Sequence, residues 1–299
     1  MHLKRVASVL LQPRKTTVFD KMLDILIALI PTAIAGCIYF GYNSVMLIFC
    51  CIAVAVAAEW ICARLLHVEG NVKNLSAVVT GLLIALGQSP SMPVWAAMAC
   101  TVLAVVVARM FFGGNGCEIV NPAALGIVLS RLSFPILAGS LNDAFSHMET
   151  TLSPLNAPEG TFTVKQLLFG AHSGAIGEVG SLFLLLGALY IFVRRVHSPT
   201  VPLFAVVGAV LTSLIFSVDL SVILLGSGLL LGSAFMAPDR TTSPHNISGQ
   251  LVYGFLIGVI AVLIYRFGGE EGVYYAILIM NLLRPLCSAI PDFNLKEAE

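Results

Sequence analysis

The sequence predicts an all-α polytopic membrane protein with about ten transmembrane helices in two inverted five-helix repeats. Three observations favour this fold class. The 299-residue chain is 58% hydrophobic and only 11% charged, whereas soluble domains carry about 25% charged residues. Ten apolar stretches are long enough, or nearly so, to cross a bilayer. The two halves of the chain also echo each other, and a repeated unit with an odd number of helices is inverted relative to its copy.

Three short segments recur in the same order and carry this echo. In the first half they are Gly81-Leu82-Leu83-Ile84-Ala85-Leu86, Ser89-Pro90 and Phe112-Gly113-Gly114. In the second half they are Gly228-Leu229-Leu230-Leu231-Gly232-Ser233, Ser243-Pro244 and Phe267-Gly268-Gly269. Inverted units meet around a site near the bilayer midplane, so the arrangement suits ions, electrons or small solutes.

The apolar stretches place the elements in order. The first repeat (22–138) is expected to hold helices at 22–40, 44–65, 75–89, 93–111 and 122–138. The second repeat (178–290) is expected to hold helices at 178–194, 201–217, 220–236, 249–266 and 272–288. The stretches 75–89 and 220–236 end in Pro-containing segments, which is typical of the discontinuous helices that line transport sites.

Charge placement predicts the topology. The segment 1–21 is basic and leads directly into the first long apolar stretch, so we expect a cytoplasmic N-terminus and no cleavable signal. Ten crossings return the tail, 291–299, to the cytoplasm and place the connecting loop, 139–177, outside. The protein is therefore expected to be a multi-pass protein of the inner or plasma membrane. With 16 basic and 16 acidic residues the chain has no net charge that would suggest a nucleic-acid partner.

Ionisable side chains at membrane depth are expensive, which makes each a functional candidate. Glu59 lies one turn before Arg64, so an internal ion pair competes with a role in ion uptake. Glu178 could be a first-turn acid of the sixth helix, favoured by the helix dipole, or a functional group. We expect Glu59, Asn121, Asp239 and Asn281 to form the polar lining of an ion pathway between the repeats.

Three loops carry further signals. The run 113–123 is a glycine-rich turn that leads into an Asn-Pro helix start; its backbone N–H groups could hold a ligand, or it could simply be a tight turn. The run 235–244 places an acid, a base and hydroxyls between two apolar spans, and a solvated loop is the alternative. The run 147–155 in the outer connection is a hydroxyl cluster. The seven cysteines form no CxxC pair, so no metal site is predicted.

Five motifs follow one another along the chain. They are Asn74 to Leu83; the GGxGxxxxNPA loop; Gly174 to Glu178; Phe235-Met236-Ala237-x-Asp239 with Thr242-Ser243-Pro244; and Glu271-Gly272 followed by Ala276-Ile277-Leu278-x-Met280-Asn281-x-x-x-Pro285. In this order they resemble the RnfD/NqrB family over about 21–291. The likeness is closest to the RnfD subunit of the Rnf complex, and NqrB belongs to the sodium-pumping NADH:quinone oxidoreductase.

The resemblance implies a membrane subunit of a complex that exchanges electrons between ferredoxin and NAD while moving sodium ions or protons. It implies a fold similar to urea and ammonium channels, an FMN joined through its phosphate to a threonine in an external loop, and partner subunits that carry iron–sulfur clusters and another flavin. On this basis the expected cofactor-binding residues are Ser153, Thr151, Thr150, Asn121, Gly113, Gly114, Glu178 and Asp239.

This chain departs from the family's flavin-attachment signal. Ser153 stands where the acceptor threonine belongs, His147 replaces the leading Asp and Leu152 replaces Ala, with Thr151 as the alternate acceptor. Glu118 also stands where the glycine loop commonly has Asn. A channel or secondary transporter without redox activity, and a cofactor-free scaffold subunit, therefore remain alternative functions. A second, non-covalent flavin such as riboflavin, or a quinone, between the repeats is also left open.

Overall fold

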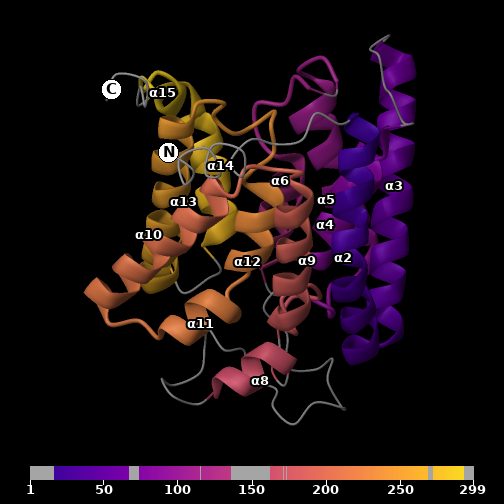
Figure 1. The fold of residues 1–299 in the computed structure, drawn as a ribbon. Helices are drawn as coiled ribbons and strands as arrows, with labels where there is room; N and C mark the ends of the chain where they lie inside the picture. The colour runs from indigo at the N-terminus through magenta and orange to yellow at the C-terminus, as the bar shows by residue number, and fades with distance from the viewer. Residues whose placement is uncertain are drawn as a thin grey trace.

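The computed structural model describes residues 17–66, 74–114, 116–135, 162–170, 172, 174–268 and 272–292. Within these ranges all regular structure is helical, as the sequence predicts (Figure 1). The candidate flavin acceptors Thr150, Thr151 and Ser153 lie outside the described residues.

The helices follow the predicted order. The first half contains α2 (Val18–Phe40), α3 (Tyr42–Leu66), α4 (Ser76–Leu86), α5 (Val94–Val105), the π-helix η2 (Val106–Met110) and α6 (Pro122–Ser133). The second half contains α9 (Ser181–Arg194), α10 (Thr200–Phe216), α11 (Leu220–Leu225), α12 (Leu229–Leu231), the π-helix η4 (Gly232–Met236), α13 (Ile247–Gly268), α14 (Val273–Leu282) and α15 (Arg284–Ser288). A short helix, α8 (Val164–Phe169), precedes α9. Each of the ten predicted stretches overlaps helix.

Length and surface composition indicate a membrane protein. Among the described residues, α2, α3 and α13 are long and apolar enough to cross a bilayer, and several shorter helices are also apolar. Large apolar side chains point outward, including Ile38, Tyr42 and Ile215, which are 75%, 77% and 76% exposed. Water disfavours so much exposed apolar surface, whereas lipid tails do not.

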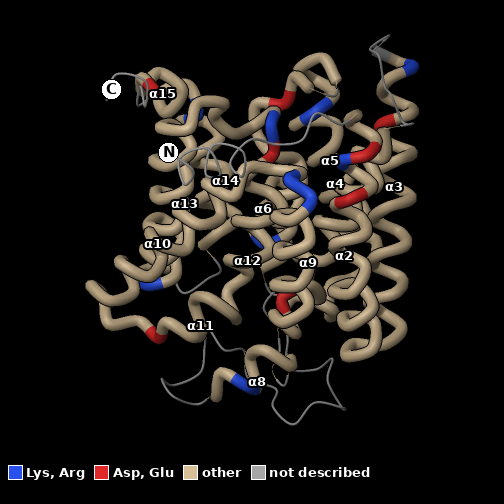
Figure 2. Tube along the Cα trace, viewed as in Figure 1, with Lys and Arg blue, Asp and Glu red and all other residues tan. Residues whose placement is uncertain are grey.

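Charged residues have an uneven distribution along the bundle. Figure 2 shows most of the Lys, Arg, Asp and Glu residues in the part of the bundle that includes α15, and few in its middle. This separation is typical of a helical protein whose central zone lies in hydrocarbon.

The predicted stretches 220–236 and 272–288 are interrupted, and the break that follows α4 joins the two halves. The stretch 220–236 divides into α11, α12 and η4, with the left-handed Gly228 (φ 69°) between the first two. After α4 ends, the Leu86 carbonyl accepts a hydrogen bond from the Gly177 N–H (2.7 Å), and the Gln88 carbonyl accepts one from the Ile176 N–H (3.0 Å). Backbone of the first half therefore pairs with the segment that precedes α9, which satisfies groups that the break exposes.

Glycines set the closest helix contact in the second half. α10 packs along α13 (Figure 1). A Cβ on Gly208 would lie 2.2 Å from the Phe255 carbonyl oxygen, and one on Gly258 would lie 2.0 Å from the Ala205 carbonyl oxygen. The two backbones approach each other directly, as small residues permit in membrane helix pairs.

Candidate functional site

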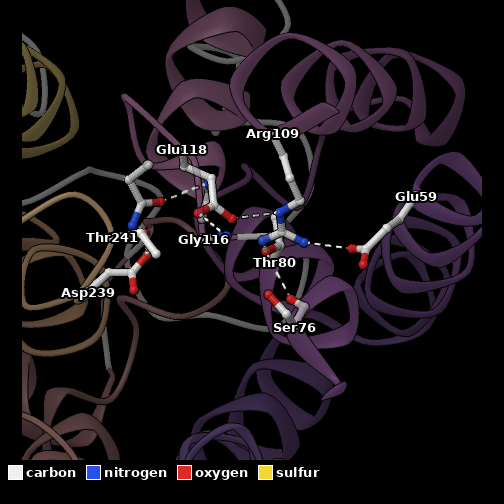
Figure 3. A network of polar contacts seen from close by, with 10 residues as sticks. Glu59, Ser76, Thr80, Arg109, Gly116, Glu118, Asp239 and Thr241 are labelled. Carbon is white, nitrogen blue, oxygen red and sulfur yellow. Dashed lines mark hydrogen bonds and ion pairs between the residues drawn. The ribbon is translucent and has the colours of Figure 1, made fainter. Parts of the chain in front are cut away.

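A buried ionic network links three segments of the first half. The Arg109 guanidinium, on η2, donates from Nη1 to Glu59 of α3 (2.7 Å) and from Nε to Glu118 of the following loop (3.0 Å). Its Nη2 donates to the Thr80 hydroxyl of α4 (2.8 Å), which in turn donates to the Ser76 carbonyl (3.0 Å). The side chains of Arg109 and Glu59 are 3% and 0% exposed. Figure 3 shows the guanidinium between the two carboxylates.

The network corrects one expectation. Glu59 does form an internal ion pair, but with Arg109, fifty positions along the chain, and not with Arg64. Arg64 instead stacks on Trp60, with its guanidinium carbon 4.2 Å from the ring centroid.

Glycines shape the loop that carries Glu118. Gly113, Gly114 and Gly116 have φ values of 112°, 93° and 98°, a region that other residues rarely adopt. The turn they form lets the Gly116 N–H donate to Glu118 Oε2 (2.9 Å), while Oε1 receives Arg109. The glycine-rich run therefore orients an acid toward the buried arginine.

The loop ends in a capped helix start at the junction of the two halves. The Asn121 side-chain oxygen accepts from the Ala123 N–H (2.9 Å) and the Ala124 N–H (3.2 Å), and Pro122 occupies the first turn of α6. The Asn121 amide nitrogen donates to the Met236 carbonyl of the second half (2.9 Å).

A second asparagine meets the first at this junction. The Asn281 side-chain amide lies 2.7 Å from the Tyr253 hydroxyl. With its oxygen facing the Asn121 backbone N–H (2.8 Å), the same amide can also donate to the Ile277 and Thr242 carbonyls (3.3 Å each). We assign this orientation because it satisfies every polar atom of the amide.

A small cavity lies beside the network, between the halves. Its volume is about 40 Å³, and one buried water needs about 10–15 Å³, so it has room for a few waters or one ion. The lining residues that bear polar groups are Ser76, Thr80, Arg109, Asn121, His197 and Asp239. Asp239 is half-buried, accepts from the Thr241 hydroxyl (2.9 Å), and lies with Thr241 across from Glu118 in Figure 3.

His197 adds a neutral imidazole to the cavity wall. Burial, with smaller contributions from the positive charges of Lys21 and Arg240, lowers the pKa of His197 to about 4. Its Nδ1 is buried and has no hydrogen-bond partner among the described residues.

Glu178 lies in a different environment. It is buried, and its Oε1 accepts from the Tyr274 hydroxyl (2.8 Å) while its Oε2 accepts from the Ala175 N–H (3.4 Å). It precedes α9, which begins at Ser181, so the expectation of a first-turn helical acid is wrong. Gly180 holds a left-handed conformation (φ 78°) at the N-cap and separates the acid from the helix.

The structure brings some predicted residues together and separates others. Asn121, Asp239 and Asn281 meet at the junction, and Glu59 reaches the same place through Arg109. Gly113 and Gly114 belong to the loop that presents Glu118, whereas Glu178 does not line the cavity. The residues that the sequence analysis missed are Arg109, Thr80 and His197; a charge inside the apolar stretch 93–111 was the available signal for Arg109.

Comparison with known proteins identifies the family of this chain. Residues 8–292 match the model of the NQR2, RnfD, RnfE family. The D-type subunit of a sodium-translocating ferredoxin:NAD(+) oxidoreductase complex from Acetobacterium woodii is 32% identical over 276 residues, covering 89% of this chain and 86% of that protein. A proton-translocating counterpart from Clostridium ljungdahlii is 29% identical (89% and 87% covered), and the D-type subunit of an ion-translocating oxidoreductase complex from Stutzerimonas stutzeri is 30% identical (90% and 89% covered). The chain therefore belongs to the NQR2, RnfD, RnfE family.

Proposed function

We propose that this chain is the D-type membrane subunit of an ion-translocating ferredoxin:NAD oxidoreductase (Rnf) complex. Relatives of that name align with nearly its whole length, and they include both sodium- and proton-translocating complexes. The observation that carries the proposal in this molecule is a buried network of charges that adjoins a polar cavity between the halves. Buried ionisable groups beside a polar cavity in a membrane protein are candidates for an ion or proton pathway.

In this proposal the ion crosses at the junction of the two halves. Asn121 and Asp239 line the cavity, Asn281 contacts Asn121, and Glu59 lies behind Arg109. Oxygen atoms from carboxylates, amides and backbone carbonyls are the ligands that hard cations such as the sodium ion prefer.

The electron-carrying group would be FMN on the connection 139–177, with Ser153 as acceptor and Thr150 and Thr151 beside it. A bound FMN would supply one- and two-electron transfer, and the protein would supply its position and electrostatics. The cavity that Asn121 and Asp239 line, about 40 Å³, is of a size that suits an ion better than an isoalloxazine ring. We therefore assign Asn121 and Asp239 to the ion and not to the flavin, and riboflavin or a quinone would need a larger space elsewhere.

Partner subunits with iron–sulfur clusters and flavin would complete the electron path.

Both termini would lie in the cytoplasm. The inverted layout requires an N-terminal tag and a tag near Asp143 to report opposite compartments in a protease-protection assay of sealed vesicles. The same compartment for both tags would remove the inverted repeat.

The redox proposal is tested with the whole complex. Affinity purification through a tag on this chain should recover subunits with flavin and iron–sulfur absorption, and the preparation should reduce NAD with reduced ferredoxin. In sealed vesicles this reaction should drive uptake of ²²Na⁺ or acidification. Recovery of the chain alone, with ion flux that needs no electron donor, would identify a channel or secondary transporter instead.

Covalent FMN has a separate test. Mass spectrometry of the peptide that contains residues 147–155 should show the added mass of FMN, and the denatured chain should fluoresce in a gel. Ser153→Ala should abolish both signals and Thr151→Ala should preserve them. Loss only in the Thr151 variant would move the acceptor, and an unmodified peptide from active complex would indicate a scaffold or transport role for this chain.

A further inference from the structure

Arg109 forms more hydrogen bonds and ion pairs than the packing of its helix requires. All three of its nitrogens donate, to Glu118, Glu59 and Thr80, which belong to three different segments. Buried ion pairs contribute little net stability, because the cost of removing both charges from water offsets their attraction. An apolar cluster of similar volume would hold α3, α4 and η2 together as well, so stability alone does not account for the arginine.

The position of the guanidinium puts it in competition with a migrating cation. Arg109 and Thr80 form one wall of the cavity, and Asp239 and Asn121 belong to the same lining. A cation that enters from Asp239 meets a fixed positive charge. The carboxylates of Glu118 and Glu59 are not among the lining residues; they accept hydrogen bonds from that guanidinium, which separates them from the cavity.

Two π-helical segments, one from each half, contribute to the cavity wall. In η2 the Phe111 N–H donates to the Val106 carbonyl five residues earlier (3.0 Å), and in η4 the Ala237 N–H donates to the Gly232 carbonyl (2.8 Å). The first segment carries Arg109, and the second carries Phe235, another lining residue. A π-turn contains one residue more than the α-turn it replaces and occurs frequently at functional sites. A return to α geometry would rotate Arg109 relative to α3 without unfolding the helix.

The geometry points to Arg109 as a tethered counter-ion that closes the ion path. While its guanidinium binds Glu59 and Glu118, these carboxylates are not available to a cation in the cavity. Passage requires the guanidinium to release Glu118, the ligand nearer the loop. This role rests on the proposed ion translocation and adds the residue that prevents leakage when no electrons flow.

The test is passive cation flux through the purified complex in liposomes, with no electron donor present. We expect Arg109→Gln to raise ²²Na⁺ or proton flux under an imposed potential by about tenfold, the factor that corresponds to loss of one hydrogen bond to a charged group. Arg109→Lys should raise it less, because the ammonium keeps the positive charge, although it cannot span two carboxylates as a guanidinium does. Arg194→Gln is the matched control: it removes another arginine–carboxylate pair, with Asp24 (3.1 Å), that does not line the cavity.

The outcomes separate the gate from the function. Flux that rises in the Arg109 variants and not in Arg194→Gln supports the gate, whichever cation carries it. Wild-type flux in an assembled Arg109→Gln complex overturns it. If that variant does not assemble, unchanged flux in Arg109→Lys overturns it equally. Failure of the wild-type complex to couple ferredoxin oxidation to ion uptake would instead remove the proposed function, and the donor-free flux would not report on that.

Discussion

Two buried glutamates of this protein are accommodated in opposite ways. Glu59 faces a full positive charge, Arg109, which a second carboxylate and a hydroxyl share. Glu178 accepts from neutral donors, the Tyr274 hydroxyl and the Ala175 N–H. The Glu59 contacts include an ion pair, whose attraction a moving cation could disturb. The Glu178 contacts described here are hydrogen bonds from a hydroxyl and an N–H, which depend on how closely these groups fit around the carboxylate.

The largest expected effect comes from removing the guanidinium that pairs with Glu59. Arg109→Leu leaves two carboxylates buried without their guanidinium, which should lower the free energy of unfolding by about 3–5 kcal/mol. Arg194→Leu, whose side chain is 45% exposed, should cost at most about 1 kcal/mol. Thermal unfolding of both variants in the same detergent measures the difference. Equal losses of unfolding free energy would show that the buried network contributes no more to stability than the exposed Arg194–Asp24 pair.

Acid should destabilise the cavity beside Arg109 through His197, which lines it. Its pKa is near 4 in the folded protein and near 6.5 when unfolded, so the unfolded chain binds more protons between these values. Stability should therefore fall as the pH drops from 6.5 to 4, by about 2–3 kcal/mol. His197→Gln should remove this part of the pH dependence, and the exposed His245→Gln should retain it. A pH profile that both variants share would assign the slope to other groups.

An added side chain at Gly228 should crowd Glu178 and destabilise the fold. A Cβ on Gly228 would lie 2.3 Å from Glu178 Oε1 and 2.9 Å from the Tyr274 hydroxyl, at a φ of 69°. Gly180 is also in the left-handed region (φ 78°), and the nearest atom to its added Cβ is a Phe183 ring carbon at 3.0 Å. We expect Gly180→Ala to cost about 1 kcal/mol, chiefly for backbone strain, and Gly228→Ala to cost at least about 2 kcal/mol. Similar unfolding midpoints for the two variants would mean that the space around Glu178 adjusts freely.

The smallest effect isolates one hydrogen bond. Tyr274→Phe removes the hydroxyl that donates to Glu178 and should cost about 1.5–2 kcal/mol, whereas Tyr39→Phe, which loses a more exposed bond to the Phe169 carbonyl (2.7 Å), should cost about 0.5–1 kcal/mol. Equal losses would place Glu178 in a polar environment that replaces the phenol, and the contrast with Glu59 would then weaken.

The helices were predictable because apolar length is a local signal. Each expected stretch overlaps helix, and the break predicted in 220–236 is present at Gly228. The site was predictable only in part. Asn121 and Asp239 could be chosen as polar groups beside apolar spans, but the Glu59 partner lies fifty residues away, whereas the sequence offered Arg64 one turn on. Glu178 was assigned to a helix because the pairing of Gly177 with Leu86, which holds its segment outside α9, is a long-range contact that periodicity does not report.

The glycine contacts between α10 and α13 limit where the molecule can change shape. Side chains are absent where the two backbones touch, at Gly208 and Gly258, so there is no soft layer over which one helix could slide. The two helices should therefore move together as one rigid unit. Any displacement that accompanies transport would then concentrate in the interrupted run from α11 to η4, whose short helices and glycines can pivot between this rigid pair and the rest of the bundle.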